Sequence, residues 1–277
     1  MKYKVRMIAF DLDGTLLTTD KRLTDETRRT LEQAAKRGIL LVPATGRPLT
    51  GMPAEVLGIA GVRYAITANG ARVVSAEDGK ILREKLISVE KARKVLDIYG
   101  EYDTLREIYY DGQGYMEARQ MEQLDHYVPD PNMAKYMRNT RKCVPDLMEK
   151  FRQENRAMDK VQAVFACAGE KEQAFRRIWE MEGVEATGAL SYNIEVTAGG
   201  INKGEALLWL AGELGIDREE ILAFGDGAND ADMIRAAGIG AAMEVSVPEV
   251  RAAADILAGS NDEDGVARAI QRYIDLG

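Results

Sequence analysis

Short apolar runs alternate with amphipathic segments over the first quarter of the chain. The apolar runs at residues 5–10, 39–42 and 63–67 have the length of buried strands, and the segments 24–37 and 49–58 have the periodicity of helices. Strands that alternate with helices in this way are typical of a parallel, doubly wound sheet. We therefore expect a Rossmann-like α/β fold at the start of the chain.

The pattern changes after residue 70 and predicts an inserted α+β domain. Apolar segments at 71–75 and 81–86 flank a polar turn and predict an antiparallel hairpin. The elements predicted further along are helices at 88–100, from 145 and at 171–182, a hairpin around 111–114 and a strand at 160–167. This mixture differs from the regular alternation that precedes it.

The alternation of strand and helix returns in the last quarter of the chain. It predicts helices at 203–214, 229–237, 247–254 and from about 262, with strands at 221–224 and 239–243. The chain therefore rejoins its first domain. We assign residues 1–83 and 189–277 to a discontinuous core domain, and residues 84–188 to the insertion.

Composition narrows the classes of protein to which the chain can belong. With 277 residues, 46% of them hydrophobic and 30% charged, it has the length of about two domains and the balance of an ordinary globular protein. No apolar stretch approaches the ~20 residues that span a bilayer, and the N-terminus lacks a signal-peptide core, so we expect a cytoplasmic protein without a membrane partner. The net charge of -8 opposes non-specific binding of nucleic acid. Cys143 and Cys167 form no C-x-x-C pair, so neither a disulfide framework nor a zinc site is expected.

Two aspartates, Asp11 and Asp13, stand at the end of the first apolar run and are followed at once by Gly14 and Thr15. Ligands of open parallel sheets bind beyond the carboxyl ends of the strands, so this is a natural place for reacting carboxylates. The pair indicates phosphoryl-transfer chemistry. Asp-Gly-Thr is also a common turn composition, and spacing alone is equally compatible with a plain turn.

A second acidic cluster follows the apolar strand at 221–224, where Asp226 and Asp230 stand in a glycine-rich segment. Mg²⁺ prefers oxygen ligands and is typically held by one or two carboxylates together with substrate phosphate. Asp11 and Asp226 suit that demand, and a bound cation would offset the acidity of the chain toward an anionic substrate. The alternative is that these acids belong to a turn and a helix N-terminus, where negative charge is favourable in any case.

Two further segments carry groups that suit a phosphate. Thr45, Gly46 and Arg47 follow the second predicted strand and offer a hydroxyl, backbone N–H groups and a guanidinium, or they form a plain loop before a proline. Lys203 opens a predicted helix after two glycines, and a lysine at a helix N-terminus is a ready anion site. A lysine at the first helical position can equally be a solvated surface residue.

These four segments, in this order, resemble the motifs of the haloacid dehalogenase superfamily of phosphohydrolases. The family's D-x-D-G-T is matched by residues 11–15, its Thr or Ser after the second strand by Thr45, its lysine by Lys203, and its G-D-x-x-N-D by residues 225–230. The insertion is similar in position, size and α/β character to the large cap domain of the Cof-type subfamily.

Two other segments extend the likeness to Cof-type members. They are residues 67–71, before the insertion, and residues 260–266, near the end of the chain. One segment departs from the pattern: many members have Met-Gly-Asn-Ala where this chain has residues 243–246, Met-Glu-Val-Ser. That departure leaves the neighbouring loop outside the resemblance, whereas the catalytic set matches.

The resemblance implies an aspartyl-phosphate mechanism that uses Mg²⁺. Asp11 would attack phosphorus, and Asp13 would protonate the leaving oxygen and later activate water. An acid at position 13 favours hydrolysis, because related ion-pumping ATPases carry threonine there. The implied metal set is Asp11, Asp13 through its backbone carbonyl, and Asp226, with Asp230 in support; the implied phosphate-binding set is Thr45, Gly46, Arg47, Lys203 and Asn229.

The function implied is that of a phosphatase for a small phosphorylated metabolite, such as a sugar phosphate, whose leaving group the cap selects. A phosphotransferase or phosphomutase, or a non-enzymatic module with the same fold, stays an alternative. The metabolite and the oligomeric state cannot be inferred from the sequence. His126 could touch substrate or lie at the surface, and we expect the tyrosines of the insertion to pack its core; these are Tyr109, Tyr110 and Tyr115.

Overall fold

The computed structural model describes residues 3–188 and 192–275, which divide into two compact units. The first comprises the residues up to Glu84 and those from Asn202 onward, and the second runs from Lys85 to Ile201. The expected insertion covered residues 84–188, whereas the second unit extends to Ile201. The reason is that β11 (Asn193–Ala198) is hydrogen bonded along both edges to strands of the second unit, β10 and β9.

The first unit is built on a five-stranded parallel sheet in the order β14-β13-β12-β1-β2. Its strands are β1 (Met7–Phe10), β2 (Leu40–Pro43), β12 (Ile221–Gly225), β13 (Ile239–Ala242) and β14 (Ile256–Leu257). The first strand lies between β12 and β2, with Phe10 opposite both Phe224 and Pro43. The predicted parallel α/β core is therefore confirmed.

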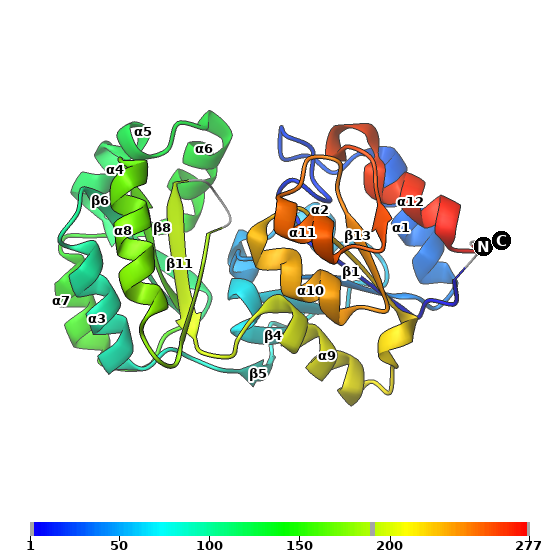
Figure 1. The fold of residues 1–277 in the computed structure, drawn as a ribbon, viewed down its shortest axis with the longest axis horizontal. Helices are drawn as coiled ribbons and strands as arrows, with labels where there is room; N and C mark the ends of the chain where they lie inside the picture. The colour runs from blue at the N-terminus through cyan, green and yellow to red at the C-terminus, as the bar shows by residue number, and fades with distance from the viewer. Residues whose placement is uncertain (1–2, 189–191, 276–277) are drawn as a thin grey trace. The chain divides into compact units, whose positions relative to one another are not determined.

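Helices cover both faces of this sheet (Figure 1). They are α1 (Asp25–Lys36) and α12 (Gly265–Tyr273) on one face, and α9 (Lys203–Glu213), α10 (Ala231–Ala236) and α11 (Pro248–Ala253) on the other. Within β1, Ile8 belongs to the apolar cluster of the first face and Ala9 to that of the second. Burial on both faces explains why the strands read as continuous apolar runs.

Local signals set the ends of α1. The Thr24 side chain accepts a hydrogen bond from the backbone N–H of Thr27, which satisfies one of the free donors of the first turn. Gly38 follows the helix with a φ of +80°, a conformation that glycine adopts at no steric cost. The expected helix at 49–58 is instead split into η1 (Leu49–Gly51) and α2 (Ala54–Leu57), because Pro53 lacks the N–H that a continuous helix needs.

The predicted hairpin at 71–86 is present and carries a third strand. β3 (Tyr64–Thr67), β4 (Arg72–Ser75) and β5 (Ile81–Glu84) form a separate antiparallel sheet in that order. Among the described residues, β3 pairs with the parallel sheet through isolated bridges, such as Ala44 to Ile66, and its Ala65 and Ile66 pack in the apolar clusters on the two faces of that sheet. The third apolar run was therefore a strand as expected, but it pairs mainly with the hairpin.

The second unit contains a six-stranded sheet in the order β10-β11-β9-β6-β7-β8, in which only β7 and β8 are parallel. The strands not yet bounded are β6 (Thr104–Tyr110), β7 (Gln113–Glu117), β8 (Arg141–Val144), β9 (Lys160–Phe165) and β10 (Val184–Thr187). The predicted turn between β6 and β7 is confirmed, since Asp111 and Gly112 both have positive φ, as a two-residue hairpin turn requires.

Helices pack on this second sheet in two groups. α3 (Val89–Tyr99), α7 (Leu147–Glu154) and α8 (Ala168–Trp179) share one apolar cluster with the sheet, and α4 (Ala118–Glu122), α5 (Leu124–Tyr127) and α6 (Pro131–Thr140) contribute to another. The second group, together with β8, β10 and β11, was not predicted from the sequence. These elements are short, and their apolar residues follow no clear period.

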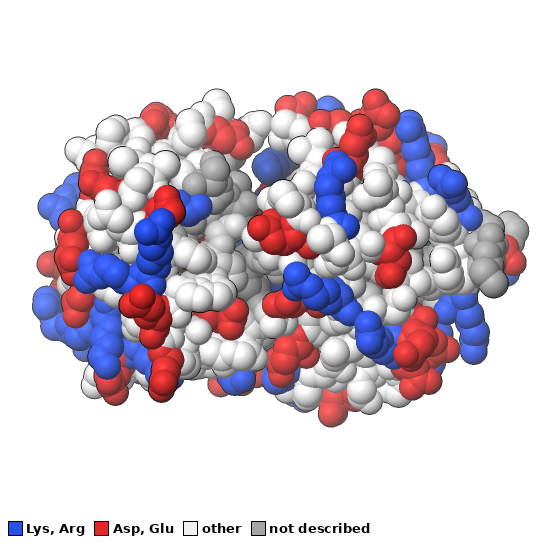
Figure 2. Space-filling model, viewed as in Figure 1, with Lys and Arg blue, Asp and Glu red and all other residues white. Residues whose placement is uncertain are grey.

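Two expectations about environment can be compared with the structure. Among the described residues, none of the helices has the length and apolar character needed to cross a bilayer. Cys143 and Cys167 are free and exposed thiols. On the face drawn in Figure 2, Lys and Arg side chains are interspersed with Asp and Glu, in keeping with a chain whose cations do not form a stripe.

Candidate active site

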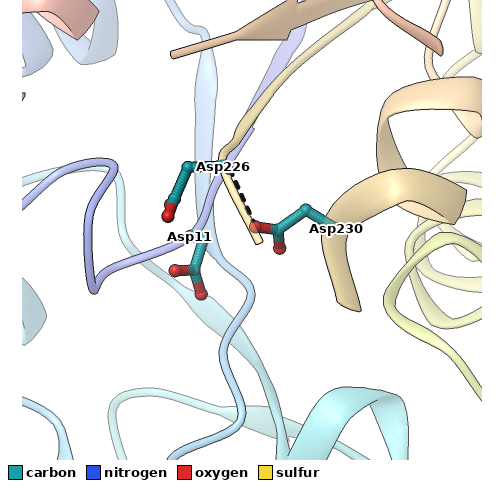
Figure 3. Close-up of side chains that lie close together, drawn as sticks. All are labelled: Asp11, Asp226 and Asp230. Carbon is teal, nitrogen blue, oxygen red and sulfur yellow. Dashed lines mark hydrogen bonds between the residues drawn. The ribbon is translucent and has the colours of Figure 1, made fainter. Parts of the chain in front are cut away.

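Two neighbouring strand ends bring the predicted acidic residues together. Asp11 follows β1 and Asp226 follows the neighbouring strand β12, and the backbone N–H of Asp11 donates to the Phe224 carbonyl at 3.1 Å. Asp230 lies one short turn beyond Asp226, in η4 (Ala228–Asp230). Carboxylate oxygens of the three aspartates lie within 4.8 Å of one another (Figure 3). The parallel order of the strands thus assembles groups that are more than 200 positions apart.

Lys203 lies inside this cluster and is completely buried. Its Nζ donates to Asp11 Oδ1 at 2.7 Å and to Asp230 Oδ1 at 2.7 Å. The backbone holds the lysine in place, because Lys203 opens α9 and the Asn202 side chain caps that helix by accepting from the Glu205 N–H at 2.8 Å. The alternative of a solvated surface lysine is therefore wrong.

Asp230 supports the loop that carries Asp226. Its Oδ2 accepts hydrogen bonds from the backbone N–H groups of Asp226 and Gly227, both at 3.0 Å, while its Oδ1 accepts from Lys203. The loop packs tightly against this side chain, since a Cβ at Gly225 would lie 2.4 Å from the Asp230 Cβ. Both carboxylate oxygens of Asp230 are thus engaged by the protein, which favours the supporting role over that of a direct metal ligand.

Asp226 is held by the loop that follows Asp11. The Thr15 hydroxyl donates to Asp226 Oδ1 at 2.5 Å. Gly14 has a φ of +85°, and a Cβ there would lie 2.4 Å from Asp226 Oδ2, so any other residue would displace the carboxylate. The glycine and threonine of the D-x-D-G-T segment therefore position an acid that comes from a different strand.

The electrostatics of the cluster suit a divalent cation. Burial, together with the repulsion of Asp230 and Asp11, raises the pKa of Asp226 to about 8. Burial raises the pKa of Asp11 to about 7, although Lys203 acts in the opposite direction. Three carboxylates thus lie beside one lysine, which pairs with two of them, Asp11 and Asp230. The surplus of negative charge and the all-oxygen donor set match what Mg²⁺ binds.

Asp13 has a different environment from Asp11. Arg47 donates to both of its carboxylate oxygens, from Nε at 2.7 Å and from Nη2 at 2.6 Å, and Lys21 Nζ lies 2.8 Å from Oδ1. Burial acts to raise the pKa of Asp13, but these two cations outweigh it and lower the pKa to about 2. Asp13 is therefore an ionised, paired carboxylate, and Arg47 is its principal partner.

The loop after β2 is braced by the segment after β3. The Thr45 hydroxyl accepts from the Arg47 N–H at 3.1 Å, so Thr45, Gly46 and Arg47 form a tight turn. The Thr45 and Arg47 carbonyls accept hydrogen bonds from the backbone N–H groups of Asn69 and Ala68, at 3.1 and 3.2 Å. Ala68 and Asn69 both have positive φ, which is strained for alanine and tolerated by asparagine.

Asn229 is oriented by this same segment. Its Nδ2 donates to Asn69 Oδ1 at 3.0 Å, and both side chains are buried. Sequence reasoning noted the segment at 67–71 but gave Asn69 no part in the site. A signal was present, because the Asn-Gly pair follows an apolar run that the sequence predicts as a strand of the α/β core, and loops after such strands stand at the ligand-binding edge.

Residues 260–266, which we call the clasp, hold the chain that follows Asp13 through side-chain hydrogen bonds. Asp262 accepts from the Thr19 N–H at 2.8 Å and from its hydroxyl at 2.7 Å, and Asn261 Nδ2 donates to the Leu17 carbonyl at 2.9 Å. Asp264 accepts hydrogen bonds from the hydroxyls of Thr24 and Thr27. The clasp holds both ends of the loop that carries Lys21, the second partner of Asp13.

The departure at 243–246 lies beside the Asp226 loop. The Ser246 hydroxyl donates to the Met243 carbonyl at 2.8 Å, and the Val247 N–H donates to the Asp226 carbonyl at 3.0 Å. Val245 is 77% exposed. Residues 243–246 therefore form a turn whose hydrogen bonds involve the backbone of the Asp226 loop. The Asp226 side chain is hydrogen bonded by Thr15.

The residues that sequence reasoning singled out in the second unit lie in different environments within that unit. His126 is exposed, with its ring nitrogen 3.4 Å from Asp103, so it occupies a surface position. Tyr110 and Tyr115 pack in the apolar core beneath α3, α7 and α8, as expected. Tyr109 is equally buried but lies on the opposite face of the sheet from Tyr110, because successive side chains of a strand alternate.

The comparisons with known proteins cover almost the whole chain. Residues 8–270 match the sequence profile of the haloacid dehalogenase-like hydrolases. The chain is 27% identical to the 5-amino-6-(5-phospho-D-ribitylamino)uracil phosphatase YcsE of Bacillus subtilis, over 98% of this chain and 96% of that protein. It is 30% identical to an HMP-PP phosphatase of Escherichia coli, over 89% of this chain and 87% of that protein.

Solved structures show the same likeness. A haloacid dehalogenase-like hydrolase from B. subtilis superposes with a TM-score of 0.85 at 26% identity, covering 96% of this chain and 99% of its own. Another from Bacteroides thetaiotaomicron gives a TM-score of 0.80 at 28% identity, covering 97% and 99%. The resemblance that the motifs carried is therefore confirmed, and the chain belongs to the family of haloacid dehalogenase-like hydrolases.

Proposed function

We propose that this protein is a Mg²⁺-dependent phosphatase that hydrolyses a small phosphorylated metabolite through an aspartyl-phosphate on Asp11. The observation that carries the proposal is the buried cluster in which Lys203 joins Asp11 and Asp230 beside Asp226. A protein that only bound partners would have no use for a fully buried lysine and three acids at a sheet edge. The relatives support the proposal, since those cited above are named as phosphatases.

In the first step an oxygen of Asp11 attacks phosphorus, and the bond between phosphorus and the leaving oxygen breaks. Asp11 suits this role because its backbone is fixed between two strands and Lys203 holds one of its oxygens at 2.7 Å. A carboxylate so oriented can attack without further loss of conformational freedom. In the second step water attacks phosphorus and releases Asp11 with inorganic phosphate.

The phosphoryl group needs donors for its oxygens as charge develops on them. Lys203 is a point charge directly beside the nucleophile, and Asp230 fixes its direction. We assign the remaining contacts to the Thr45 hydroxyl, the Gly46 backbone N–H and the Asn229 side chain. Preorganised donors of this kind stabilise the transition state more than the bound substrate.

Asp13 serves as the acid and base. In this structure it is the ionised form, held by Arg47 and Lys21, and this form accepts a proton from the water of the second step. To donate a proton to the leaving oxygen in the first step, Asp13 must first give up the Arg47 pair. Arg47 would then be available to the incoming phosphate, which accepts the same bidentate contacts as a carboxylate.

We assign the metal to Asp11, Asp226 and the backbone carbonyl of Asp13, with Asp230 as support. The electrostatics of the cluster support the choice, because burial raises the pKa values of Asp11 and Asp226 and a divalent cation would favour the ionised form of both. When bound, Mg²⁺ supplies charge neutralisation between the carboxylates and the phosphate and polarises the phosphoryl oxygens. The second unit, residues 85–201, acts as the cap that selects the leaving group.

A phosphatase screen tests the proposal. Purified protein with Mg²⁺ is assayed for inorganic phosphate release from a panel of phosphomonoesters, and again with excess EDTA. We expect release from several small phosphomonoesters and its loss with EDTA. Absence of release across the panel would contradict the proposal, and an isomerised phosphosugar in place of free phosphate would identify a phosphomutase.

A further inference from the structure

The backbone is left-handed at three consecutive residues that directly follow β3. The φ angles are +49° at Ala68, +56° at Asn69 and +101° at Gly70, and this is the only run of three positive φ values among the residues that the structure describes. Glycine adopts such angles freely and asparagine tolerates them, whereas alanine adopts them only under strain. We call residues 68–70 the left-handed turn. Backbone strain persists only where the surrounding structure enforces it, and it is concentrated at functional sites.

The first contacts of the left-handed turn are with the loop after β2. The backbone N–H of Asn69 donates to the Thr45 carbonyl at 3.1 Å, and that of Ala68 donates to the Arg47 carbonyl at 3.2 Å. Successive N–H groups of an extended strand point in opposite directions, so the chain must leave the extended conformation of β3 for both bonds to form. The strained backbone thus fixes the loop that carries Thr45.

The second contact is with η4. Asn229 Nδ2 donates to Asn69 Oδ1 at 3.0 Å, and the two residues are 160 positions apart in the chain. The exposed fraction is 2% for Asn69 and 9% for Asn229, so the bond is shielded from water and fixes the orientation of the Asn229 amide. That amide nitrogen carries two hydrogens. Asn69 accepts one of them, and the phosphate contact that we assign to Asn229 uses the other.

The third contact is with the start of α9. A Cβ added to Gly70 would lie 2.4 Å from the Asn202 carbonyl oxygen and 3.3 Å from the Ala206 Cβ, so the backbone of the turn packs directly on the helix. Asn202 is the N-cap of α9, and Lys203 is its first residue. The turn therefore fixes the helix start from which Lys203 reaches Asp11.

The left-handed turn thus contacts three of the loops that we assign to the phosphoryl group. These loops carry Thr45, Lys203 and Asn229, and all of them belong to the first unit together with the turn. Asn69 is the one residue of the turn with a polar side chain, and that side chain acts on a group assigned to the phosphate. The strain at Ala68 is explained by the need for one short segment to contact all three loops.

We propose that Asn69 is a positioning residue of the phosphate site, which acts on bound phosphate through the amide of Asn229. Its side-chain oxygen holds that amide with one N–H directed at the phosphoryl oxygens. Without Asn69 the amide would have to be ordered each time phosphate binds, and a preorganised donor binds more strongly than one that must first be ordered. The inference rests on the proposed function, because it concerns the phosphate site of the same phosphatase.

Asn69→Gly tests this role. Glycine adopts the left-handed backbone and keeps the N–H that donates to Thr45, but the acceptor of the Asn229 amide is deleted. The probe is inorganic phosphate, whose Kd for the full chain with Mg²⁺ is measured by isothermal titration calorimetry. We expect this Kd to rise about tenfold, the loss typical of one hydrogen bond to a bound ligand, and kcat/KM for phenyl phosphate to fall by a similar factor. An unchanged Kd would overturn the proposal.

A double-mutant cycle decides whether Asn69 acts through Asn229. Asn229→Ala removes the amide itself and should also raise the Kd of phosphate about tenfold. In that background Asn69→Gly should have no further effect, because no amide is left to orient. A rise of about a hundredfold in the double variant, the product of two independent effects, would overturn the proposal and leave Asn69 with a structural role alone.

Asn155→Gly is the matched control. Asn155 is also a left-handed asparagine, with a φ of +41°, but it is exposed and follows α7 in the second unit. The same substitution there should leave the Kd of phosphate and kcat/KM at the wild-type values, and circular dichroism checks that both glycine variants fold. An equal rise of the Kd in the two variants would contradict the role of Asn69.

The wild type supplies a second measurement, which decides the proposal if Asn69→Gly does not fold. In a sample labelled with ¹⁵N at asparagine, the side-chain NH₂ signals of Asn229 are those absent from Asn229→Ala. Inorganic phosphate with Mg²⁺ should shift these signals, because one N–H of the amide contacts phosphate. Signals that do not move at saturating phosphate would overturn the proposal.

The outcomes also separate this inference from the proposed function. If the wild type hydrolyses phosphomonoesters and the Kd of phosphate is the same in Asn69→Gly, only the inference fails. If the wild type hydrolyses no ester but binds phosphate with a Kd that depends on Asn69, the proposed function fails and the inference holds. If the wild type binds no phosphate, the inference fails whatever the activity.

Discussion

The strand-end cluster of the core and the sheet of the cap both bury charge, but they balance it differently. In the core, Lys203 pairs with Asp11 and Asp230 beside a third carboxylate, Asp226, so negative charge is left over. Burial, together with repulsion between the carboxylates, raises the pKa values of Asp11 and Asp226. On the cap sheet, Lys160 and Arg141 are matched by Glu195 and Glu107. A surplus of buried negative charge suits a metal and a reacting phosphate, whereas buried charges that are already paired call for no further ion.

The comparison shows that buried charge is arranged differently in the two units of the chain. In the proposed function, the core groups bind the phosphoryl group, which all phosphomonoesters share. Variants of the core should therefore affect all phosphomonoesters alike.

The largest effect is expected from Asp11→Asn. If the core alone carries the bond-breaking step, loss of the nucleophile should lower kcat by at least about ten-thousandfold for every phosphomonoester, whatever its leaving group. Phosphate release is the measurement, and circular dichroism checks the fold. Asp232→Asn is the control, because Asp232 is an exposed acid on α10 that pairs with Arg235. Substantial turnover by Asp11→Asn on any ester would contradict the assigned nucleophile.

The next effect is expected from Lys203→Met, which removes the only cation of the core cluster. Asp11 and Asp230 would lose their shared partner in a fully buried site, and we expect the free energy of unfolding to fall by about 3–5 kcal/mol. Urea denaturation measures this, together with loss of phosphate release. Arg235→Met, which removes an exposed ion pair at 2.9 Å, should cost about 0.5 kcal/mol. Equal losses in the two variants would refute the surplus-charge description of the core.

Magnesium should stabilise the core in proportion to its surplus charge. A cation that binds only the folded chain, at a free concentration of 100 times its Kd, adds about 2.7 kcal/mol to the free energy of unfolding. The melting temperature should rise accordingly. Asp226→Asn removes one assigned ligand and should reduce that rise. Thermal denaturation with and without Mg²⁺ measures the difference, and Asp232→Asn should behave like the wild type. A full Mg²⁺ response in Asp226→Asn would place the ion elsewhere.

The smallest effect is expected at the clasp that supports Asp13. Asp262→Ala deletes the acceptor of both hydrogen bonds from Thr19, which should cost about 1 kcal/mol of stability and lower kcat/KM a few-fold. Urea denaturation and steady-state kinetics on one ester measure the two effects. Glu263→Ala, next to it, removes only an exposed ion pair to Arg268 and should change neither quantity. Equal values of stability and of kcat/KM in the two variants would contradict the supporting role of the clasp.

The core could be predicted from the sequence in much greater detail than the cap. Strands buried on both faces read as uninterrupted apolar runs, and Thr24 and Gly38 mark the ends of α1 in the sequence itself. In the cap, α6, β8, β10 and β11 escaped prediction, and the boundary moved from 188 to 201 with β11. The edge strands β8 and β10 have four residues each, and β11 lies between β10 and β9, so long-range pairing and not local pattern decides where these strands lie.

The sequence by itself determined which residues are candidates for the chemistry of the core: Asp11, Asp13, Lys203 and Asp226 were identifiable because each follows a strand or opens a helix within a short motif. Only the tertiary structure decided that Lys203 is buried between two acids, that Arg47 pairs with Asp13, and that Asn69 orients Asn229. It alone revealed the left-handed turn, which contacts the loops of Thr45, Lys203 and Asn229. Such contacts join residues far apart in the chain, and no local spacing records them.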